Sequence, residues 1–385
     1  MSLTPPPLAL YLHFPWCVRK CPYCDFNSHA AGADMPAAAY VEALARDLDS
    51  QAARVAGREI ISVFLGGGTP SLFSPEQIGA VLGHARRALR FATDAEVTLE
   101  ANPGTIERGS FAGYRDAGVN RVSLGAQSFE PEALQRLGRI HAADDTRRAA
   151  EELHASGLTN FNLDLMYALP EQSVAAAERD VVAALQLAPA HLSHYQLTLE
   201  PGTLFGARPP AGLPDDDVAA EMLQRCQERL ETAGFEQYEI SAYARPGRRC
   251  RHNLNYWEFG DYLGVGAGAH GKLTDAAGER IVRTTRAREP RRYLAQVRTE
   301  GVESAEETVI GRTDLPFEFM MNALCQVEGC RRTQFESRTG LPWSAVSSTL
   351  QQATRDGLVV ADGDRWRTTP LGARFLNELL QRFLP

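Results

Sequence analysis

Three cysteines near the start of the chain are spaced so that their thiolates can bind one metal centre. Cys17, Cys21 and Cys24 form the pattern C-x3-C-x2-C directly after the apolar run 8–14. A structural zinc site takes four ligands, so His29 would complete a Cys3His set. A 4Fe-4S cluster held by three thiolates instead keeps its fourth iron open for an exchangeable ligand. The spacing therefore leaves zinc and an iron-sulfur cluster as alternatives, and only the cluster explains why a fourth cysteine is missing.

The rest of the composition indicates a cytoplasmic globular protein. The seven cysteines are an odd number, and those at 226, 250, 325 and 330 are scattered, which does not resemble a secreted disulfide framework. We expect Cys325 and Cys330 to be ordinary buried thiols. There is no secretion signal and no apolar stretch of membrane-spanning length. The net charge of -8 and the scattered basic residues argue against nucleic acid as the main ligand.

Six β-like runs alternate with helical stretches, and this rhythm must position the thiols. Such alternation predicts a parallel sheet with right-handed crossovers. Each run ends in polar or glycine-rich residues, and barrel enzymes do their chemistry at that end of the strands. We therefore predict an α/β fold, a partial (β/α)6 TIM-like barrel. The six runs are 8–14, 61–68, 96–102, 121–128, 160–170 and 191–201.

The pattern changes twice along the chain, which predicts three regions. Residues 1–205 form the barrel core, and 206–304 form a connecting α/β segment with a helix at 217–233 and a strand at 236–244. Residues 305–385 are mainly helical with a short β-like stretch. That last region is expected to be a small winged-helix-like C-terminal domain, although it lacks the basic face that DNA binding needs.

The cysteine motif, with Tyr23 just before its last cysteine, resembles the signature of radical S-adenosylmethionine (SAM) proteins. In that family the amino and carboxylate groups of SAM chelate the fourth iron of a 4Fe-4S cluster. The resemblance implies that carbonyls and amides of GGGTPS (66–71) hold the methionyl amino group, that Glu100 and Asp164 accept hydrogen bonds, and that Arg139 clamps a carboxylate. The SAM pocket implied by the resemblance comprises Tyr11, Gly67, Gly68, Thr69, Glu100, Gln127, Arg139 and Asp164. Taken singly, each polar residue among them has an ordinary structural explanation.

Over nearly the whole chain, the resemblance is closest to the branch that contains oxygen-independent coproporphyrinogen III oxidase and its paralogue HemW, a haem chaperone. Three features favour the chaperone. Only sixteen residues precede Cys17, whereas the oxidase has a substantial segment there. Phe26 stands where the oxidase commonly has a further cysteine, and HNLNYW (252–257) fits the HNxxYW pattern associated with haem binding in the chaperone branch.

The HNxxYW residues have side chains that suit haem. His252 is the predicted axial ligand, and Tyr256 and Trp257 offer flat faces to the macrocycle. Cys250 and, more weakly, His270 in the glycine-rich run 264–272 are the other ligand candidates. Arg245, Arg248, Arg249 and Arg251 either pair with haem propionates or form an exposed basic loop.

Three further histidines have simpler expectations. His191 and His194, three residues apart on one predicted strand, should point to opposite faces and so not share a metal. His13 lies beside the cluster loop and is placed to hydrogen-bond there.

The resemblance implies a haem chaperone that binds haem, a 4Fe-4S cluster and SAM, and delivers haem to respiratory haemoproteins. The alternative is an oxygen-independent coproporphyrinogen III dehydrogenase, which decarboxylates propionates oxidatively in porphyrin biosynthesis. No catalytic residue is assigned, because the sequence does not decide whether SAM is cleaved. The cluster would then either support one-electron reduction or govern homodimer formation and docking, including peripheral docking to a membrane complex. A third alternative is a zinc-stabilised barrel that acts as a binding module.

Overall fold

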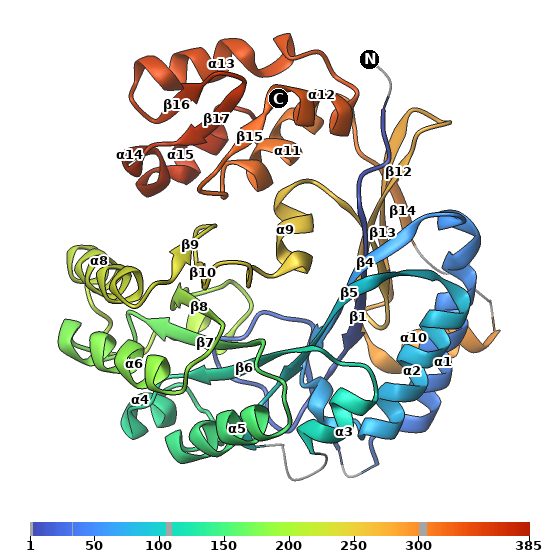
Figure 1. Cartoon of the computed structure of the whole chain (residues 1–385), viewed down its shortest axis with the longest axis vertical. Helices are drawn as coiled ribbons and strands as arrows, with labels where there is room; N and C mark the ends of the chain where they lie inside the picture. Colours follow the sequence, from blue (N-terminus) through green and yellow to red (C-terminus); the bar gives the residue numbers. More distant parts are fainter. Residues whose placement is uncertain (1–2, 33, 105–109, 300–305) are drawn as a thin grey trace.

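A single mixed sheet organises most of the chain. The computed structural model describes residues 3–32, 34–104, 110–299 and 306–385, and within these ranges twelve strands join in the order β14-β13-β12-β11-β1-β4-β5-β6-β7-β8-β10-β9 (Figure 1). The seven central strands run parallel to one another. They are β11 (Asp261–Val265), β1 (Leu8–Phe14), β4 (Glu59–Gly67), β5 (Arg90–Ala101), β6 (Arg121–Gln127), β7 (Phe161–Tyr167) and β8 (His191–Gln196). The six predicted strands and the partial barrel are thus confirmed.

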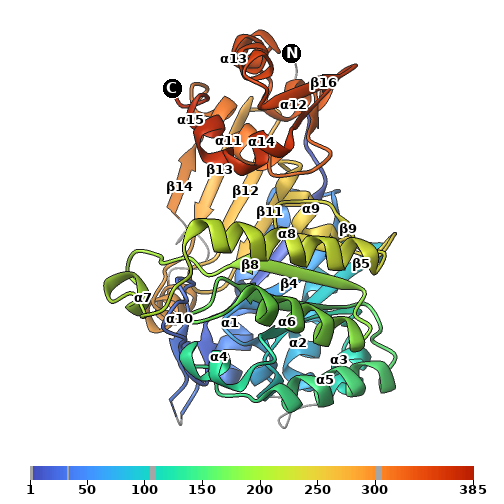
Figure 2. The ribbon, with the colours of Figure 1, turned by 90° about the vertical axis from the view of Figure 1, so that its left-hand side faces the viewer.

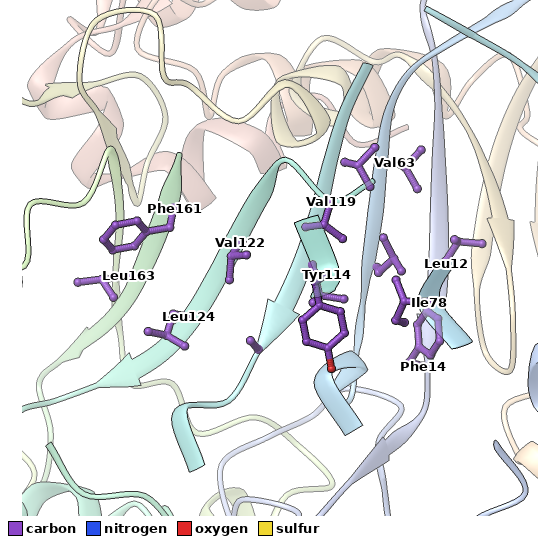
Figure 3. Close-up of a cluster of buried hydrophobic side chains, with 14 of the residues drawn as sticks. Leu12, Phe14, Val63, Ile78, Tyr114, Val119, Val122, Leu124, Phe161 and Leu163 are labelled. Atoms are coloured by element: carbon purple, nitrogen blue, oxygen red, sulfur yellow. The ribbon is translucent and has the colours of Figure 1, made fainter. Parts of the chain in front are cut away.

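Successive side chains of each parallel strand point alternately to a packed outer face and to a polar interior. In β1, Leu10 and Leu12 belong to the main hydrophobic cluster, whereas Tyr11 lines cavities inside the barrel. In β7, Leu163 packs outward and Asp164 faces inward. Side chains two residues apart share a face of a strand, so the polar residues of successive strands converge in the interior. Figure 3 shows the apolar residues of β1, β4, β6 and β7 in the outer cluster.

Helices cover the outer face of the parallel strands (Figures 1 and 2). The start of α2 shows how the sequence sets a boundary: Ser74 and Gln77 form a reciprocal capping box around Pro75. The helices between residues 37 and 299 are α1 (Ala37–Ala52), α2 (Pro75–Ala88), α3 (Phe111–Asp116), α4 (Pro131–Arg136), α5 (Ala143–Ala155), α6 (Val174–Gln186), α7 (Leu204–Ala207), α8 (Asp216–Thr232), α9 (Arg251–Trp257) and α10 (Pro290–Thr299), with 3-10 turns at Ala53–Val55 and Pro70–Leu72. Of these, α9 lies instead on the inner side of the sheet, where its His252 ring stacks on Phe64. The helix predicted at 217–233 is therefore confirmed as α8.

Antiparallel strands extend both edges of the parallel sheet, and here the sequence prediction needs correction. The single strand predicted at 236–244 is two short strands, because the chain turns at 238–241 and the buried Glu239 carboxylate accepts hydrogen bonds from Ser241. On the opposite edge, β11 was not among the six predicted strands. The short edge strands are β9 (Glu236–Gln237), β10 (Ala242–Ala244), β12 (His270–Asp275), β13 (Arg280–Thr285) and β14 (Glu306–Val309).

The C-terminal region has its own hydrophobic cluster, as expected for a winged-helix-like domain. It also has a three-stranded sheet, β15-β17-β16 (Figure 1). The N-terminal segment contributes Leu3 to this cluster, and the Thr4 amide donates to the carbonyl of Ser337 at 3.0 Å. Its elements are α11 (Leu315–Ala323), β15 (Cys330–Arg331), α12 (Arg332–Thr339), α13 (Ser344–Arg355), β16 (Val359–Asp362), β17 (Arg365–Thr368), α14 (Pro370–Arg374) and α15 (Leu376–Gln381). Cys325 and Cys330 are buried there, as predicted. Among the described helices, none has the length and apolar character needed to cross a bilayer.

Candidate functional site

The loop after β1 presents the three cysteines to one cavity. Its ends are joined by two short parallel strands, β2 (Trp16–Cys17) and β3 (His29–Ala30), with the Ala31 amide donating to the Cys17 carbonyl at 2.7 Å. Cys17, Cys21 and Cys24 are partly buried, form no disulfide, and line a cavity of about 150 Å³, here called the cluster cavity. The sequence spacing therefore does bring the three thiols to a common space.

The surroundings of the thiols suit a cluster better than a zinc ion. Arg139 donates from Nη1 to the Cys21 sulfur at 3.6 Å, and burial raises the pKa of Cys17 and of Cys24. In the part of the chain that is described, no three His, Cys, Asp or Glu side chains are gathered closely enough to hold one metal ion. The three thiolates of a 4Fe-4S cluster can lie further apart than those of a zinc site, because each thiolate binds a different iron. His29, the fourth ligand of the zinc alternative, does not line the cavity.

The glycines at the end of β4 allow the chain to pass very close to the end of β1. A Cβ atom on Gly67, whose φ is 105°, would lie 2.3 Å from the His13 ring, and one on Gly68 would lie 2.6 Å from the Phe14 carbonyl oxygen. The amides of 67–69 are already bonded, to Glu100 Oε2 and to the carbonyls of Phe14 and Trp16. The amides expected to contact SAM are thus engaged within the protein, and the Thr69 carbonyl also accepts a hydrogen bond, from the Leu72 amide at 3.0 Å.

Seven of the eight residues predicted for the SAM pocket line the cluster cavity, and these are Gly67, Gly68, Thr69, Glu100, Gln127, Arg139 and Asp164. Two of them have buried polar atoms without a partner among the described residues: Gln127 Oε1, an acceptor, and Arg139 Nε, a donor. Such atoms are costly unless a ligand pairs with them. SAM has hydroxyl and ammonium donors for Gln127 and a carboxylate for Arg139, so the residues present fit this cofactor.

The two carboxyl groups in the cluster cavity are held in different ways. Burial, followed by the charge of Asp164, raises the pKa of Glu100 to about 8, so its carboxyl is mostly protonated at neutral pH. Asp164 accepts hydrogen bonds from Asn162 (2.8 Å) and Ser123 (3.1 Å), although burial raises its pKa. A cationic ligand near Glu100 would favour the ionised form.

The remaining predicted SAM residue, Tyr11, lies in two neighbouring cavities. An interior cavity of about 250 Å³ is lined by residues that include Tyr11, Phe64, Arg121, His191 and His252. A side cavity of about 390 Å³ is lined by residues that include Tyr11, Tyr256, Tyr262, His270 and Arg288. Glu100 lines all three cavities, so all three border on this residue.

A chain of hydrogen bonds fixes the cluster loop to the wall of the side cavity. Tyr11 Oη lies 3.0 Å from His13 Nδ1, and His13 Nε2 lies 2.9 Å from the Asn27 carbonyl. Because a carbonyl only accepts, Nε2 carries the proton and Tyr11 donates to Nδ1. Burial lowers the pKa of His13 to about 4, which keeps this neutral tautomer. The Asn27 amide also donates to the carbonyls of Ala267 (3.0 Å) and Arg288 (2.9 Å). The bond predicted between His13 and the loop is confirmed.

The histidine of HNxxYW lies deep inside the barrel. His252 is 1% exposed, with Nδ1 3.1 Å from Ser62 Oγ and Nε2 3.0 Å from Tyr256 Oη. Burial lowers the pKa of His252 to about 3, so the ring is neutral. Both ring nitrogens are engaged, so this arrangement offers none to haem iron. Trp257 lines none of the three cavities, whereas Tyr256 lines two.

The other haem candidates divide between the surface and the side cavity. His270 is exposed at the side cavity, and its Nδ1 lies 3.3 Å from Thr285 Oγ1. None of the four arginines proposed for propionates lines the three cavities. Arg249 pairs with Glu328, Arg251 pairs with Asp94, and Arg245 lies over the Phe235 ring. Cys250 is fully buried, with its Sγ 3.6 Å from Glu96 Oε1.

The structure also confirms that His191 and His194 face opposite ways. His191 Nδ1 bonds Asn162 Oδ1 at 2.6 Å within the interior cavity. His194 stacks on the Tyr167 ring on the other face of the sheet.

Tyr195, Ser123 and Arg121 line these cavities but were not predicted from the sequence. Each occupies an inward position in its strand. In the sequence, these polar residues alternate with apolar neighbours along their strands, and this pattern could have indicated that they face the interior.

Comparisons with known proteins agree with this geometry. Residues 11–181 match the radical SAM superfamily, and residues 310–375 match the HemN C-terminal domain. The chain is 49% identical to the heme chaperone HemW of Escherichia coli, with 98% of each chain covered, and 47% identical to that of Haemophilus influenzae, again with 98% of each covered. Coproporphyrinogen III oxidase (HemN) from Escherichia coli, 23% identical, has the same fold, with a TM-score of 0.81 over 98% of this chain and 90% of that one. The thiol motif, the cavities at the strand ends and these full-length relatives together show that the chain belongs to the radical SAM superfamily and, within it, to the HemW family.

Proposed function

We propose that this protein is a cytoplasmic haem chaperone that binds haem and passes it to respiratory haemoproteins. The observation that carries the proposal is the identity of up to 49%, over nearly the whole chain, with proteins named heme chaperone HemW. The side cavity supports it, because it opens next to the cluster cavity and contains aromatic, histidine and arginine side chains. These are the groups that stack on a macrocycle, ligate iron and pair with propionates.

In the cluster cavity, Cys17, Cys21 and Cys24 would hold a 4Fe-4S cluster, and SAM would bind its open iron. Such a cluster supplies one-electron reduction when SAM is bound. The protein's own part is positioning. The carbonyls of Gly67 and Gly68 would accept from the amino group of SAM, Arg139 would pair with its carboxylate, and the remaining predicted residues would surround the nucleoside.

For haem, His252 remains the predicted ligand, but the structure adds a condition. Its Nε2 becomes available only when the Tyr256 hydroxyl, 3.0 Å away, gives up its hydrogen bond. His270 needs no such change, because its Nε2 has no hydrogen-bond partner among the described residues. The proposal therefore places haem in the side cavity, where Tyr256 forms part of the wall in either case.

The test is a haem titration after anaerobic reconstitution with iron and sulfide, followed through the Soret band. We expect saturable binding near one haem per chain. If the Tyr256 hydroxyl releases His252 and His252 binds the iron, His252→Ala should remove the ligand-specific Soret band. If His270 binds the iron instead, His270→Ala should remove it. Cys21→Ala should abolish cluster absorbance and leave haem affinity largely intact. No saturable binding by the wild-type protein would refute the proposal.

A coproporphyrinogen III assay with SAM and a reductant on the same preparation addresses the alternative. Oxidative decarboxylation there would show that the protein is a dehydrogenase of the kind that shares this fold.

A further inference from the structure

Arg121 is a buried cation that contacts no carboxylate among the described residues. It is the first residue of β6, is 2% exposed, and lines the interior cavity. Its Nε has no hydrogen-bond partner, and no carboxylate of the described residues lies within 4.0 Å of its guanidinium. A guanidinium carries five N–H donors, and leaving buried donors unpaired is costly.

In the described part of the chain, the two other buried cations, Arg286 and Lys272, are neutralised by contact. Arg286 bonds the Asp47 carboxylate through Nε at 3.0 Å and Nη2 at 2.7 Å. Lys272 lies 3.0 Å from Asp261 Oδ1. The fold therefore supplies a carboxylate where a buried cation is purely structural, and it supplies none at Arg121.

Arg121 supplies positive charge to the interior cavity, whereas the histidines around it are neutral. Burial lowers the pKa of His191 and of His252, so both rings are neutral. Glu96 accepts from the Arg251 amide at 2.9 Å, and Asp164 accepts from Asn162 and Ser123. Burial lowers the pKa of the Arg121 guanidinium, but the nearby Cys250, Glu96, Tyr238 and Asp164 raise it above its ordinary value, so the group stays charged. Glu100 is mostly protonated at neutral pH.

The interior cavity adjoins the space proposed for haem. Tyr11, Glu100 and Tyr256 line both it and the side cavity. A volume of about 250 Å³ is too small for a macrocycle but takes a short carboxylate arm. Haem carries two such arms, its propionates.

We propose that Arg121 binds a propionate of the tetrapyrrole that lies in the side cavity. This inference rests on the proposed function. The HNxxYW histidine forms part of the same cavity, so this motif helps to shape the propionate site whichever residue binds the iron. Arg121 would pair with both carboxylate oxygens, a geometry that a lysine cannot reproduce in full.

The experiment compares haem with haem dimethyl ester, whose propionates cannot be anionic, in equilibrium titrations of the reconstituted protein. The wild type should bind haem about 10- to 100-fold more tightly than the ester, the value of a charged hydrogen bond. Arg121→Gln should bind both equally, and Arg121→Lys should keep part of the preference. Arg90→Gln, an exposed arginine on the neighbouring strand, is the matched control and should keep all of it. The preference is a ratio, so a general loss of stability does not imitate the expected result.

The outcomes separate the two proposals. If the wild type binds neither haem nor ester, the proposed function fails and this inference fails with it. If the wild type binds haem and Arg121→Gln keeps the preference for the free acid, only this inference is overturned. If Arg121→Gln weakens SAM binding and leaves the haem preference unchanged, Arg121 binds the SAM carboxylate and the propionate assignment is wrong.

Discussion

Glu100 should make SAM binding strongly dependent on pH. Burial and the charge of Asp164 raise the pKa of its carboxyl to about 8, yet a cationic ligand is served best by the carboxylate. With that pKa, about half of the molecules are ionised at pH 8 and about 1% at pH 6. Apparent affinity scales with the competent fraction. Glu100 alone should therefore weaken SAM binding about 50-fold between pH 8 and pH 6.

The pH dependence caused by Glu100 must be separated from that of a second group, the amino group of SAM. The SAM amino group, with an ordinary pKa of about 8, also loses a proton before it can bind iron. In the wild type both protons leave, so the logarithm of Kd should fall by about two per pH unit below pH 7. In Glu100→Gln only the amino group titrates, and the slope should be about one.

The assay is anaerobic equilibrium dialysis of SAM against the reconstituted protein from pH 6 to pH 9. Glu59→Gln, a substitution at the exposed start of β4, is the control and should retain the wild-type slope. If Glu100→Gln shows the same slope as the wild type, Glu100 does not exchange its proton for the ligand and the reasoning is refuted.

Two further predictions concern the scaffold. Asp47→Asn should destabilise the protein by about 3–5 kcal/mol, because it leaves the buried Arg286 guanidinium without its carboxylate, and the midpoint of urea unfolding measures this. The exposed Asp49→Asn is its control, and a loss below about 1 kcal/mol for Asp47→Asn would contradict the prediction. Asn27→Ala removes two hydrogen bonds that hold the cluster loop, together about 2 kcal/mol. Cluster absorbance should therefore decay up to about 30-fold faster with a chelator, and an unchanged rate would show that other contacts hold the loop.

The sequence predicts the elements of this protein better than their long-range partners. Local alternation identifies β1, β4 and the next four strands, and the strand-helix rhythm identifies the barrel. It does not identify β11, because that strand is short and its place beside β1 depends on pairing of Asp261–Val265 with Leu8–Leu12, about 250 positions away in the sequence. The split of 236–244 was likewise missed, since it depends on Glu239 being buried in a turn.

Distance along the sequence also decides which features of the candidate site could be predicted. Cys17, Cys21 and Cys24 are close in sequence, so their spacing alone indicates a shared centre. The state of His252 is set by Ser62, 190 positions away, and no motif reports whether a ring nitrogen is engaged. Arg121 has no motif around it, and its importance emerges only from the register that turns it into the barrel.

These long-range contacts also link the two ligand sites. The Tyr11 hydroxyl reaches the cluster loop through His13 and Asn27, and the Tyr11 ring forms part of the side cavity proposed for haem. Asn27 in turn holds the carbonyl of Arg288 at the same cavity. A cluster that orders this loop therefore also orders the wall against which haem would lie. Because such coupling is reciprocal in binding free energy, bound haem should raise the equilibrium affinity for the cluster by the same factor by which the cluster raises the affinity for haem.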